Sequence, residues 1–561
     1  MRRVRYRPRR HQDVMNKPLP LVVEDISFRY RNRPEWAIRQ VSFSLEPGEV
    51  LLVAGASGCG KTTLARCLNG LIPHSYKGEL QGSIRLQERE TCAMSLSEFS
   101  QVVGTVLQDP ERQVVGSSVL AEVAFGPENL GLPREEIQAR IDEVLQRLGI
   151  AHLKRRETFA LSGGEKQKVV LAGVLAMRPS ILLLDEPLAS LDPASAREAL
   201  ALFRSLADEG TSILLIEHRV EDALQARPDR LLYMRDSQVH YLGPIKELPA
   251  EVNHREVKLP APWLIRRLKE SGEPLPEPPP PVSPSGEPLA VFEDVSFAYP
   301  DGPLVLHDIN LHIRRGDLIA VLGPNGAGKS TLVKHAIGLL KPTRGRVLVQ
   351  GKDTRSLSVA QIAHTLGYAF QSPAHMLFAA TVWDELAFGP RNLEFSPPTI
   401  KAAVTEAVAA LNLQGLEDYS PLALSFGQQK RTTIASVLAM HSRILILDEP
   451  TAGQDYANYT RFMEALCGAV GAGVSFLTSR FDATLFITHD LDLAIGYANR
   501  VILLGAGAGR IVADGPPQEA LRDLALLERC RVVPTTLLQA NLECLPRTGR
   551  FLRAEHLARF V

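Results

Sequence analysis

The chain has 561 residues, 45% of them hydrophobic, and its 63 basic and 63 acidic residues cancel to a formal net charge of zero. This length exceeds what one hydrophobic core usually supports and predicts two to four domains. A balanced charge creates no general basic field, so we expect no nucleic-acid partner.

The first element in chain order is a basic arm, which we place at residues 1–20. It begins MRRVRYRPRR, with six arginines in ten residues. We expect a disordered, solvated arm; weak attachment to an anionic membrane surface is the alternative. No run of eighteen apolar residues follows, which argues against a secretory signal or a membrane span. The six cysteines show no zinc-like spacing, and we interpret them as reduced, cytosolic thiols.

A glycine-rich loop follows an apolar strand pattern in GEVLLVAGASGCGKTTL, and it recurs in GDLIAVLGPNGAGKSTL. Residues 55–62 and 323–330 both read GxxxxGK[ST]. Glycines let successive backbone N–H groups face one anion, and the following helix adds the positive end of its dipole. We expect Lys61 and Lys329 to reach the β- and γ-phosphates of a nucleotide. A plain strand-to-helix connection is the alternative, and the recurrence makes it minor.

Two apolar runs end in paired acids, ILLLDEP from residue 181 and ILILDEP from residue 444. Continuous apolar runs indicate buried parallel strands, whose carboxyl ends bind ligands in open α/β folds. We expect Asp185 with Thr62, and Asp448 with Ser330, to hold Mg²⁺. A capping Asp beside a solvated Glu is the alternative, and repetition of the whole pattern disfavours it.

The second acid of each pair and a histidine further along the chain complete the expected chemistry. Glu186 and Glu449 are placed to orient and deprotonate the water that attacks the γ-phosphate. His218 and His489 end the next apolar strands, and we expect each to contact the same phosphate. A histidine at a strand end is more often only a polar terminus, but both halves place one there.

Two further segments, LSGGEKQKV (161–169) and LSFGQQKRT (424–432), predict helix starts. Ser162 with Glu165, and Ser425 with Gln428, have the spacing of capping boxes. Glycine in the first helical turn costs about 1 kcal/mol relative to alanine. A capping box does not explain that cost, whereas close approach of a phosphate does.

A proline-rich stretch, GEPLPEPPPPVSPSGEP, divides the chain into two similar halves. It cannot form a helix or an interior strand and predicts a semi-rigid spacer over residues 271–288. The predicted domains are 21–270 and 289–525. The remainder, 526–561, predicts a helical amphipathic tail that packs on the opposite half or on the spacer.

In the order of these motifs, from about residue 21 to 515, the sequence resembles the ATP-binding cassette (ABC) ATPases. The resemblance implies an α/β fold with two P-loop ABC-type nucleotide-binding domains in tandem. Each would have a parallel-sheet core, an antiparallel edge subdomain and a helical signature subdomain. It also implies ATP and Mg²⁺ as cofactors and hydrolysis of ATP to ADP and phosphate, coupled to transmembrane transport.

The same resemblance assigns residues to roles. The ATP-binding residues are Tyr30 and Tyr299 against adenine, Gly55, Ala56, Ser57, Gly58, Cys59, Gly60, Lys61, Thr62, Thr63, Gly323, Pro324, Asn325, Gly326, Ala327, Gly328, Lys329, Ser330 and Thr331 of the Walker A loops, Gln108 and Gln371 of the Q-loops, and Ser162, Gly163, Gly164, Glu165, Ser425, Gly427 and Gln428 of the signature helices. The metal site uses Thr62, Gln108, Asp185, Ser330, Gln371 and Asp448; the catalytic residues are Glu186, Glu449, His218 and His489; the D-loop residues are Asp192 and Asp455.

Cassettes of this family pair head to tail, so the two halves are expected to pair within the chain. Each nucleotide would lie between the Walker A loop of one half and the signature helix of the other. Only the first signature segment has both glycines, because Phe426 replaces one in the second. Since both catalytic acids and both histidines are present, we expect both sites to hydrolyse ATP.

The segments VVGSSVLAEVAFGPENLGL, MLFAATVWDELAFGPRNLEF and AGQDYANYT resemble the ATPase subunits of energy-coupling factor (ECF) importers, in the form where two ATPases are fused. The resemblance implies a peripheral location on the cytoplasmic face of the cell membrane. The partners would be a transmembrane coupling protein and a small substrate-binding membrane protein, and the cargo a vitamin, a vitamin precursor or a metal ion.

The alternative is a soluble tandem ABC ATPase that acts on ribosomes or nucleic acid. Such proteins carry a long charged helical linker, zinc cysteines or long heptad arms, and the sequence has none of these. Neither the transported substrate nor a role for the extra residues near 472–482 follows from the sequence.

Overall fold

The computed structural model describes residues 18–561 except 32, 108–109, 189–190, 246–251, 282–283, 452–455, 468–480, 506 and 508. These residues form two compact units. The first unit comprises the described residues up to Leu191 together with Ser195–Asn253, and the second comprises Asp192–Ala194 and His254–Val561. Most of the predicted basic arm, Gln108, Asp455 and most of the insertion near 472–482 lie outside the described residues.

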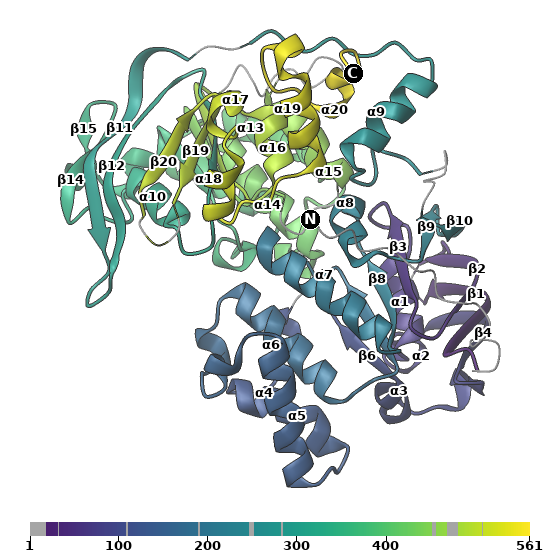
Figure 1. Cartoon of the computed structure of the whole chain (residues 1–561). Coiled ribbons are helices and arrows are strands. Elements are labelled where there is room, and N and C mark those ends of the chain that lie inside the picture. Colours follow the sequence, from purple (N-terminus) through teal and green to yellow (C-terminus); the bar gives the residue numbers. More distant parts are fainter. Residues whose placement is uncertain are drawn as a thin grey trace. The chain divides into compact units, whose positions relative to one another are not determined.

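The elements of the first half of the chain are shown in Figure 1. In chain order they are β1 (Leu21–Tyr30), β2 (Ile38–Leu45), β3 (Val50–Gly55), α1 (Lys61–Leu68), α2 (Leu71–His74), β4 (Gly78–Leu86), β5 (Arg89–Glu90), α3 (Leu96–Val102), β6 (Val103–Val106), α4 (Val119–Asn129), α5 (Arg134–Arg147), α6 (Gly163–Ala176), β7 (Ile181–Asp185), α7 (Pro193–Asp208), β8 (Ser212–Ile216), α8 (Val220–Ala223), β9 (Arg230–Arg235) and β10 (Gln238–Pro244).

The second half repeats this order between an additional helix and an additional helical tail. Its elements are α9 (Ala261–Glu270), β11 (Ser285–Ala298), β12 (Leu304–Arg315), β13 (Leu318–Leu322), α10 (Lys329–Ala336), β14 (Arg344–Val349), β15 (Lys352–Asp353), α11 (Val359–Ala363), β16 (Leu366–Ala369), α12 (Val382–Asn392), α13 (Pro397–Ala410), α14 (Phe426–Ala439), β17 (Ile444–Asp448), α15 (Tyr456–Cys467), β18 (Ala483–Ile487), α16 (Leu491–Tyr497), β19 (Arg500–Leu504), β20 (Ile511–Gly515), α17 (Pro517–Ala520), α18 (Leu524–Arg529), α19 (Thr536–Thr548) and α20 (Ala554–Leu557).

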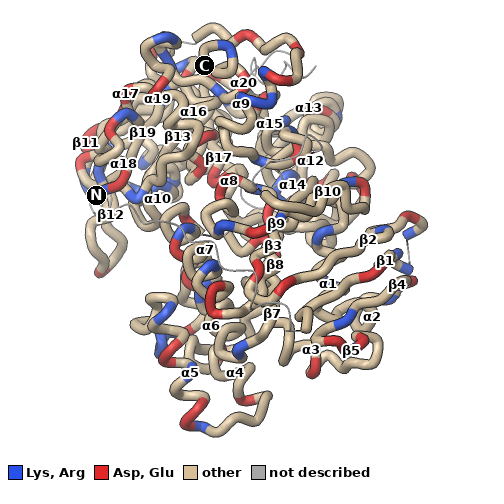
Figure 2. The backbone as a smooth tube through the Cα atoms, turned by 45° about the vertical axis from the view of Figure 1, so that its right-hand side comes forward, with Lys and Arg blue, Asp and Glu red and all other residues tan. Residues whose placement is uncertain are grey.

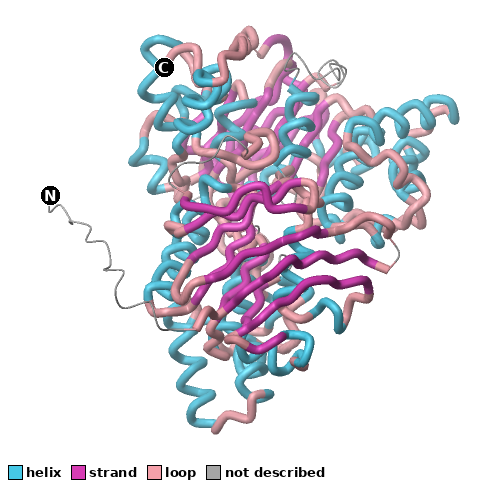
Figure 3. The backbone as a smooth tube through the Cα atoms, turned by 90° about the vertical axis from the view of Figure 1, so that its right-hand side faces the viewer, coloured by secondary structure: helices cyan, strands magenta, loops and turns pink. Residues whose placement is uncertain are grey.

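Each unit contains two sheets with matching strand order, drawn in magenta in Figure 3. The antiparallel sheets run β2-β1-β4-β5 and β12-β11-β14-β15. The six-stranded sheets run β10-β9-β3-β8-β7-β6 and β20-β19-β13-β18-β17-β16, and they are parallel except for the edge strands β10 and β20. The predicted tandem α/β fold is therefore confirmed.

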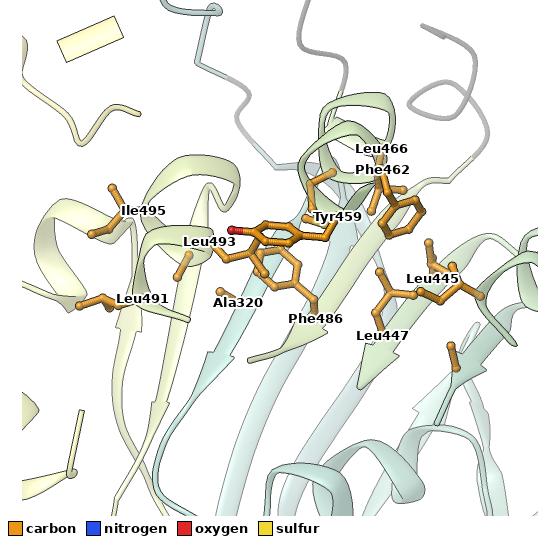
Figure 4. Packing of buried hydrophobic residues seen from close by; sticks show 14 of the residues in the cluster. Ala320, Leu445, Leu447, Tyr459, Phe462, Leu466, Phe486, Leu491, Leu493 and Ile495 are labelled. Carbon is orange, nitrogen blue, oxygen red and sulfur yellow. The ribbon is translucent and has the colours of Figure 1, made fainter. Parts of the chain in front are cut away.

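The acid-terminated strand β17 has no polar face because both of its faces are covered. Successive residues of a strand point to opposite sides of a sheet. Ile444 and Ile446 accordingly lie in one buried apolar cluster, and Leu445 and Leu447 lie in another. Figure 4 shows the second cluster, in which Phe462 of α15 packs over this face. The continuous apolar run in the sequence thus follows from burial on both sides.

A helical part in each unit carries the signature segment. Helices α4 and α5 pack on α6 in the first unit, and α12 and α13 pack on α14 in the second. In Figure 1, α4, α5 and α6 lie apart from β1, β2 and β4 of the same unit. The predicted helical signature subdomains are therefore present.

Apart from Asp192–Ala194, the second unit begins at His254, before the predicted spacer (271–288) and the predicted start of the second domain at residue 289. Ala261, Leu264 and Ile265 of α9 are buried in the same apolar cluster as Leu537 and Leu557 of the tail. Helix α9 and the tail are thus parts of one core with the second cassette rather than separate segments. The reason is apolar packing over long sequence distances, which local composition does not encode.

The tail also contacts the proline-rich spacer, one of the two predicted alternatives. The guanidinium of Arg550 donates a hydrogen bond to the carbonyl oxygen of Pro279, and that of Arg559 donates to the carbonyl oxygen of Leu275 at 3.4 Å. Strand β11 starts at Ser285, inside the predicted spacer, and there it pairs with β12 alone. Pro288 is tolerated here because β11 has no hydrogen-bonded neighbour on its other side at this point, so the missing N–H of proline leaves no second strand without a donor.

Charge is distributed evenly over the described chain. Figure 2 shows lysine and arginine interspersed with aspartate and glutamate along the elements of both units. Among the described residues, no helix combines the length and apolar character that crossing a bilayer requires.

Candidate nucleotide sites

Strand order brings the predicted motifs of each unit to one sheet edge. Strand β8 lies between β3 and β7, and all three are parallel. The loop after β3, the acids after β7 and the histidine after β8 therefore follow neighbouring strand ends, where open α/β sheets bind ligands. Strands β13, β17 and β18 repeat this arrangement in the second unit.

The loop after β3 is held open by its lysine and its glycines. Lys61 Nζ donates hydrogen bonds to the carbonyl oxygens of Gly55 and Ala56 at 2.7 and 2.8 Å. Gly60 has φ 107°, and a Cβ there would lie 2.5 Å from a backbone oxygen. Gly58, at φ 81°, has open space where a Cβ would be. Position 60 therefore requires glycine, because a side chain there would collide with the backbone of Ala37.

The loop after β13 has the same construction. Lys329 Nζ donates to the carbonyl oxygens of Gly323 and Pro324 at 2.7 and 2.9 Å. Gly326 and Gly328 have φ values of 79° and 92°, and Gly326 faces open space. Both loops precede helix N-termini, as phosphate cradles do.

Asp185 at the end of β7 is a buried carboxylate beside a hydroxyl. Burial and the neighbouring charge of Glu186 raise the pKa of Asp185 to about 6, while Lys61 and a hydrogen bond with Thr62 act in the opposite direction. A hydroxyl and a carboxylate are oxygen ligands of the kind Mg²⁺ takes in phosphate sites. No group of three or more His, Cys, Asp or Glu side chains suited to a metal occurs in the part of the chain that the structure describes. The hydroxyl of Thr62 and the carboxylate of Asp185 fit a Mg²⁺ ion that is shared with nucleotide phosphates.

Asp448 has an additional partner in the second unit. Ser330 Oγ donates to Asp448 Oδ2 at 2.9 Å, and the hydroxyl of Tyr368 donates to the same oxygen at 2.6 Å. Burial and the charge of Asp448 raise the pKa of Tyr368. Thr105 takes the matching place in the first half. The sequence analysis missed Tyr368, although a tyrosine in a buried strand signals a polar partner for its hydroxyl.

Glu186 is fixed in the strained left-handed region, with φ 49°. Its N–H donates to the carbonyl oxygen of Ile216 at 3.0 Å, so the neighbouring strand sets its direction. Its Oε1 lies 3.7 Å from His218 Nδ1. Burial opposes the charge of Glu186, but His218 and Lys61 outweigh it and lower the pKa of Glu186. Burial likewise opposes the charged form of His218, yet the interaction with Glu186 raises the pKa of His218.

Glu449 repeats the backbone geometry, with φ 48° and an N–H bonded to the carbonyl oxygen of Ile487 at 3.0 Å. Its Oε1 lies 3.1 Å from His489 Nε2. Burial raises the pKa of Glu449 to about 8, and Lys329 acts against this rise. The pKa values of the two predicted bases are therefore shifted in opposite directions.

Both predicted capping boxes are present at the starts of α6 and α14. Ser162 N–H donates to Glu165 Oε2 at 2.8 Å, and Ser425 N–H donates to Gln428 Oε1 at 3.0 Å. The first turn contains Gly163 and Gly164 in α6 but Phe426 and Gly427 in α14. Phe426 is half-buried.

The predicted adenine-stacking tyrosines lie against the first turn of the helix after each loop. The Tyr30 hydroxyl is 3.2 Å from Thr63 Oγ1 and accepts a hydrogen bond from Arg66 at 2.9 Å. The Tyr299 hydroxyl is 3.5 Å from Thr331 Oγ1.

The Q-loop and D-loop residues are described in part. Gln371 is exposed, and its carbonyl oxygen accepts a hydrogen bond from Lys430 Nζ at 2.8 Å. Asp192 Oδ1 accepts from the N–H of Ala194 at 3.1 Å. Burial lowers the pKa of Lys430 to about 8, and Asp448 and Glu449 partly oppose that shift. The sequence analysis missed Lys430 as well.

The family model described as "ABC transporter" matches residues 38–189 and 306–452, which is one match in each half. The chain belongs to the ABC transporter family. It is an ABC ATPase with two fused nucleotide-binding domains.

This ABC ATPase is 36% identical over 544 residues to a protein of Caldanaerobacter subterraneus subsp. tengcongensis whose name describes an ABC transporter ATP-binding protein, with 90% of this chain and 94% of that protein covered. A solved structure of an archaeal ribosome recycling factor, in complex with the ribosomal stalk protein, is 21% identical. It covers 89% of this chain and 92% of its own, with a TM-score of 0.59, and shows the same fold. The structure of cbiO1 from Clostridium perfringens, part of the transporter complex cbiONQ, is 32% identical and covers 47% of this chain and 98% of its own, with a TM-score of 0.38.

Proposed function

We propose that this ABC ATPase is the energy-coupling subunit of a membrane importer of the ECF type. In this proposal the chain binds peripherally to a transmembrane coupling protein, and ATP-driven closure of its two halves moves that protein. The curated relative named as a transporter ATP-binding protein supports the proposal. The observation that carries it is a pair of rigid apolar platforms, one in each unit.

Each platform is a loop held by a buried carboxylate. In the first unit, Glu122 Oε2 accepts hydrogen bonds from the N–H groups of Val115 and Gly116 at 2.8 and 2.6 Å. In the second, Glu385 Oε2 accepts from those of Phe378 and Ala379 at 2.9 and 2.8 Å. Charge-assisted bonds of this kind are stronger than neutral ones, so each loop is fixed in one conformation.

Each fixed loop and the helix that follows it, α4 or α12, present apolar side chains to solvent. Val115 and Phe125 are 66% and 53% exposed in the first unit, and Phe378 and Phe388 are 60% and 48% exposed in the second. The rings of Phe378 and Phe388 pack edge to face with centroids 4.7 Å apart. Exposed aromatic side chains on a rigid support are typical of interaction sites. A helix of a membrane partner with apolar residues fits both platforms.

We assign the hydrolytic roles on the geometry of the described residues. Lys61 and Lys329 hold the loops that receive the phosphates, and Glu186 and Glu449 are the bases for the attacking water. Mg²⁺, when bound, neutralises negative charge on the phosphates. The left-handed backbone of both glutamates fixes their direction relative to the strand ends, which is strain of the kind found at functional sites.

The composite, head-to-tail sites expected from the resemblance are part of this proposal. The alternative, action on ribosomes or nucleic acid, has less support. The solved structure of the archaeal ribosome recycling factor has 21% sequence identity to this chain, and its similarity concerns the fold alone. Along the described residues, Figure 2 shows lysine and arginine interspersed with aspartate and glutamate rather than gathered in the basic stripe that binding a nucleic-acid backbone requires.

Purification of the tagged chain from its native membranes in mild detergent, followed by mass spectrometry of bound proteins, tests the proposal. A multi-span protein with small hydrophobic subunits is the expected result. Recovery with ribosomes or nucleic acid, without membrane proteins, would refute the transporter assignment and leave the ATPase assignment intact.

A further inference from the structure

Lys430, in the second turn of the signature helix α14, is fully buried. Its Nζ donates hydrogen bonds to the carbonyl oxygens of Phe370, Gln371 and Asp448 at 2.9, 2.8 and 3.0 Å. An ammonium group has three donors, and here all three are used. Burying a charged group costs free energy unless its donors are hydrogen-bonded. The buried position of the Lys430 ammonium therefore depends on these three bonds.

The three carbonyl groups belong to two different parts of the predicted site. Phe370 and Gln371 form the exit of β16, where the Q-loop begins. Asp448 is the last residue of β17, and its carboxylate receives Ser330 and Tyr368. One side chain therefore connects the signature helix, the Q-loop backbone and the strand end that leads directly into the predicted base.

The first half offers an internal comparison. Aligning LSGGEKQ with LSFGQQK places Gln167 at the position of Lys430. Gln167 is also buried, and neither its amide nitrogen nor its amide oxygen has a hydrogen-bond partner among the described residues. Both side chains are thus buried, but among the described residues only Lys430 makes bonds of this kind.

We propose that Lys430 is a positioning residue that makes the start of α14, the exit of β16 and the end of β17 move as one body in the second unit. A displacement of the Q-loop backbone is then transmitted to Asp448 and Glu449 through three bonds to one nitrogen. Among the described residues of the first unit, Gln167 makes no equivalent connection. The inference deepens the proposed ATPase function by stating how the second site is held, and it does not depend on which partner occupies the platforms.

The test compares Lys430→Met with Gln167→Met in the full-length chain. Methionine keeps an unbranched side chain of similar size and removes the donors. For Lys430→Met we expect kcat for ATP to fall to about the value of Glu449→Gln, with KM within about twofold. In the double variant with Glu449→Gln, Lys430→Met should change kcat by less than about twofold, because both changes affect the same site. Gln167→Met should behave like the wild type, since the Gln167 amide has no hydrogen-bond partner among the described residues.

Hydrogen–deuterium exchange gives a readout that needs no turnover. Lys430→Met should speed exchange in peptides that cover Phe370–Leu377 and the end of β17, whereas Gln167→Met should leave the matching peptides of the first unit unchanged. Wild-type kcat and exchange in Lys430→Met would overturn the proposal, as would a parallel loss of ATP binding. If neither Lys430→Met nor Lys430→Gln folds, Lys430 is a structural residue and the proposal is wrong. Failure to recover membrane partners would refute the transporter assignment without changing these results.

Discussion

Replacing Glu385 by alanine removes the acceptor that holds the platform of the second unit. Two N–H groups, those of Phe378 and Ala379, lose a charged partner at 2.9 and 2.8 Å. Hydrogen bonds to a charged group contribute about 1.5–3 kcal/mol each. Because Phe378 is exposed and water can replace part of the loss, we take the lower value and expect about 3 kcal/mol in total.

Urea unfolding of the full-length chain measures this effect. With an m-value of about 3 kcal/mol per M, a loss of 3 kcal/mol lowers the midpoint of the second unit by about 1 M. Glu385→Gln keeps the shape and an uncharged acceptor, so it should lose about half as much, since charge-assisted bonds are roughly twice as strong as neutral ones. Exchange of the two amide protons should speed up in the same order.

Glu122→Ala provides the matched control in the first unit, where Glu122 accepts from Val115 and Gly116 in the same way. It should lower the midpoint of the first unit and leave that of the second in place. An unchanged midpoint in Glu385→Ala, or exchange of the Phe378 and Ala379 amides at the wild-type rate, would refute the reasoning.

Three other predictions follow from the sites. Glu186→Gln and Glu449→Gln should each lower steady-state ATP hydrolysis; full activity in either variant would show that the altered site does not contribute. Phe388→Asp should abolish co-purification with membrane partners while ATP hydrolysis by the isolated chain stays at the wild-type rate, and retention of the partners would exclude this platform as the docking surface. Because burial raises the pKa of Asp185 to about 6, its carboxyl is mostly protonated below that pH. Mg²⁺-dependent nucleotide binding should therefore weaken as pH falls through 6. Calorimetric titration at several pH values checks this, with Asp185→Asn as the reference that measures how much of the change comes from protonation of the nucleotide's own terminal phosphate.

The sequence allowed prediction of the fold and of the residues whose role depends on local spacing. The glycine loops, the strand-end acids and the capping boxes are each set by a few neighbouring residues, and the structure contains the predicted loops, strands and boxes. The strand order then brings them to one edge. Their hydrolytic roles stay predictions.

Residues whose role depends on contacts between distant segments could not be predicted in this way. Lys430 is one charged residue in a helix that contains several, and only the packing of α14 against two strand ends reveals its three bonds. Tyr368 and Glu385 were missed for the same reason. The join between α9 and the tail was missed too, because it is made by residues far apart in the chain: the N–H of Ala261 donates a hydrogen bond to Thr536 Oγ1 at 2.9 Å across 275 residues.

The early start of the second unit determines where this protein can be divided into two polypeptides. A cut in the proline-rich spacer would leave α9 on the first fragment and remove Ala261, Leu264 and Ile265 from the core that they share with the tail. Both fragments would then carry an exposed apolar surface and a tendency to aggregate. A cut between Asn253 and His254 follows the boundary between the units and keeps each core whole. Co-expressed halves separated there should reassemble into an active pair.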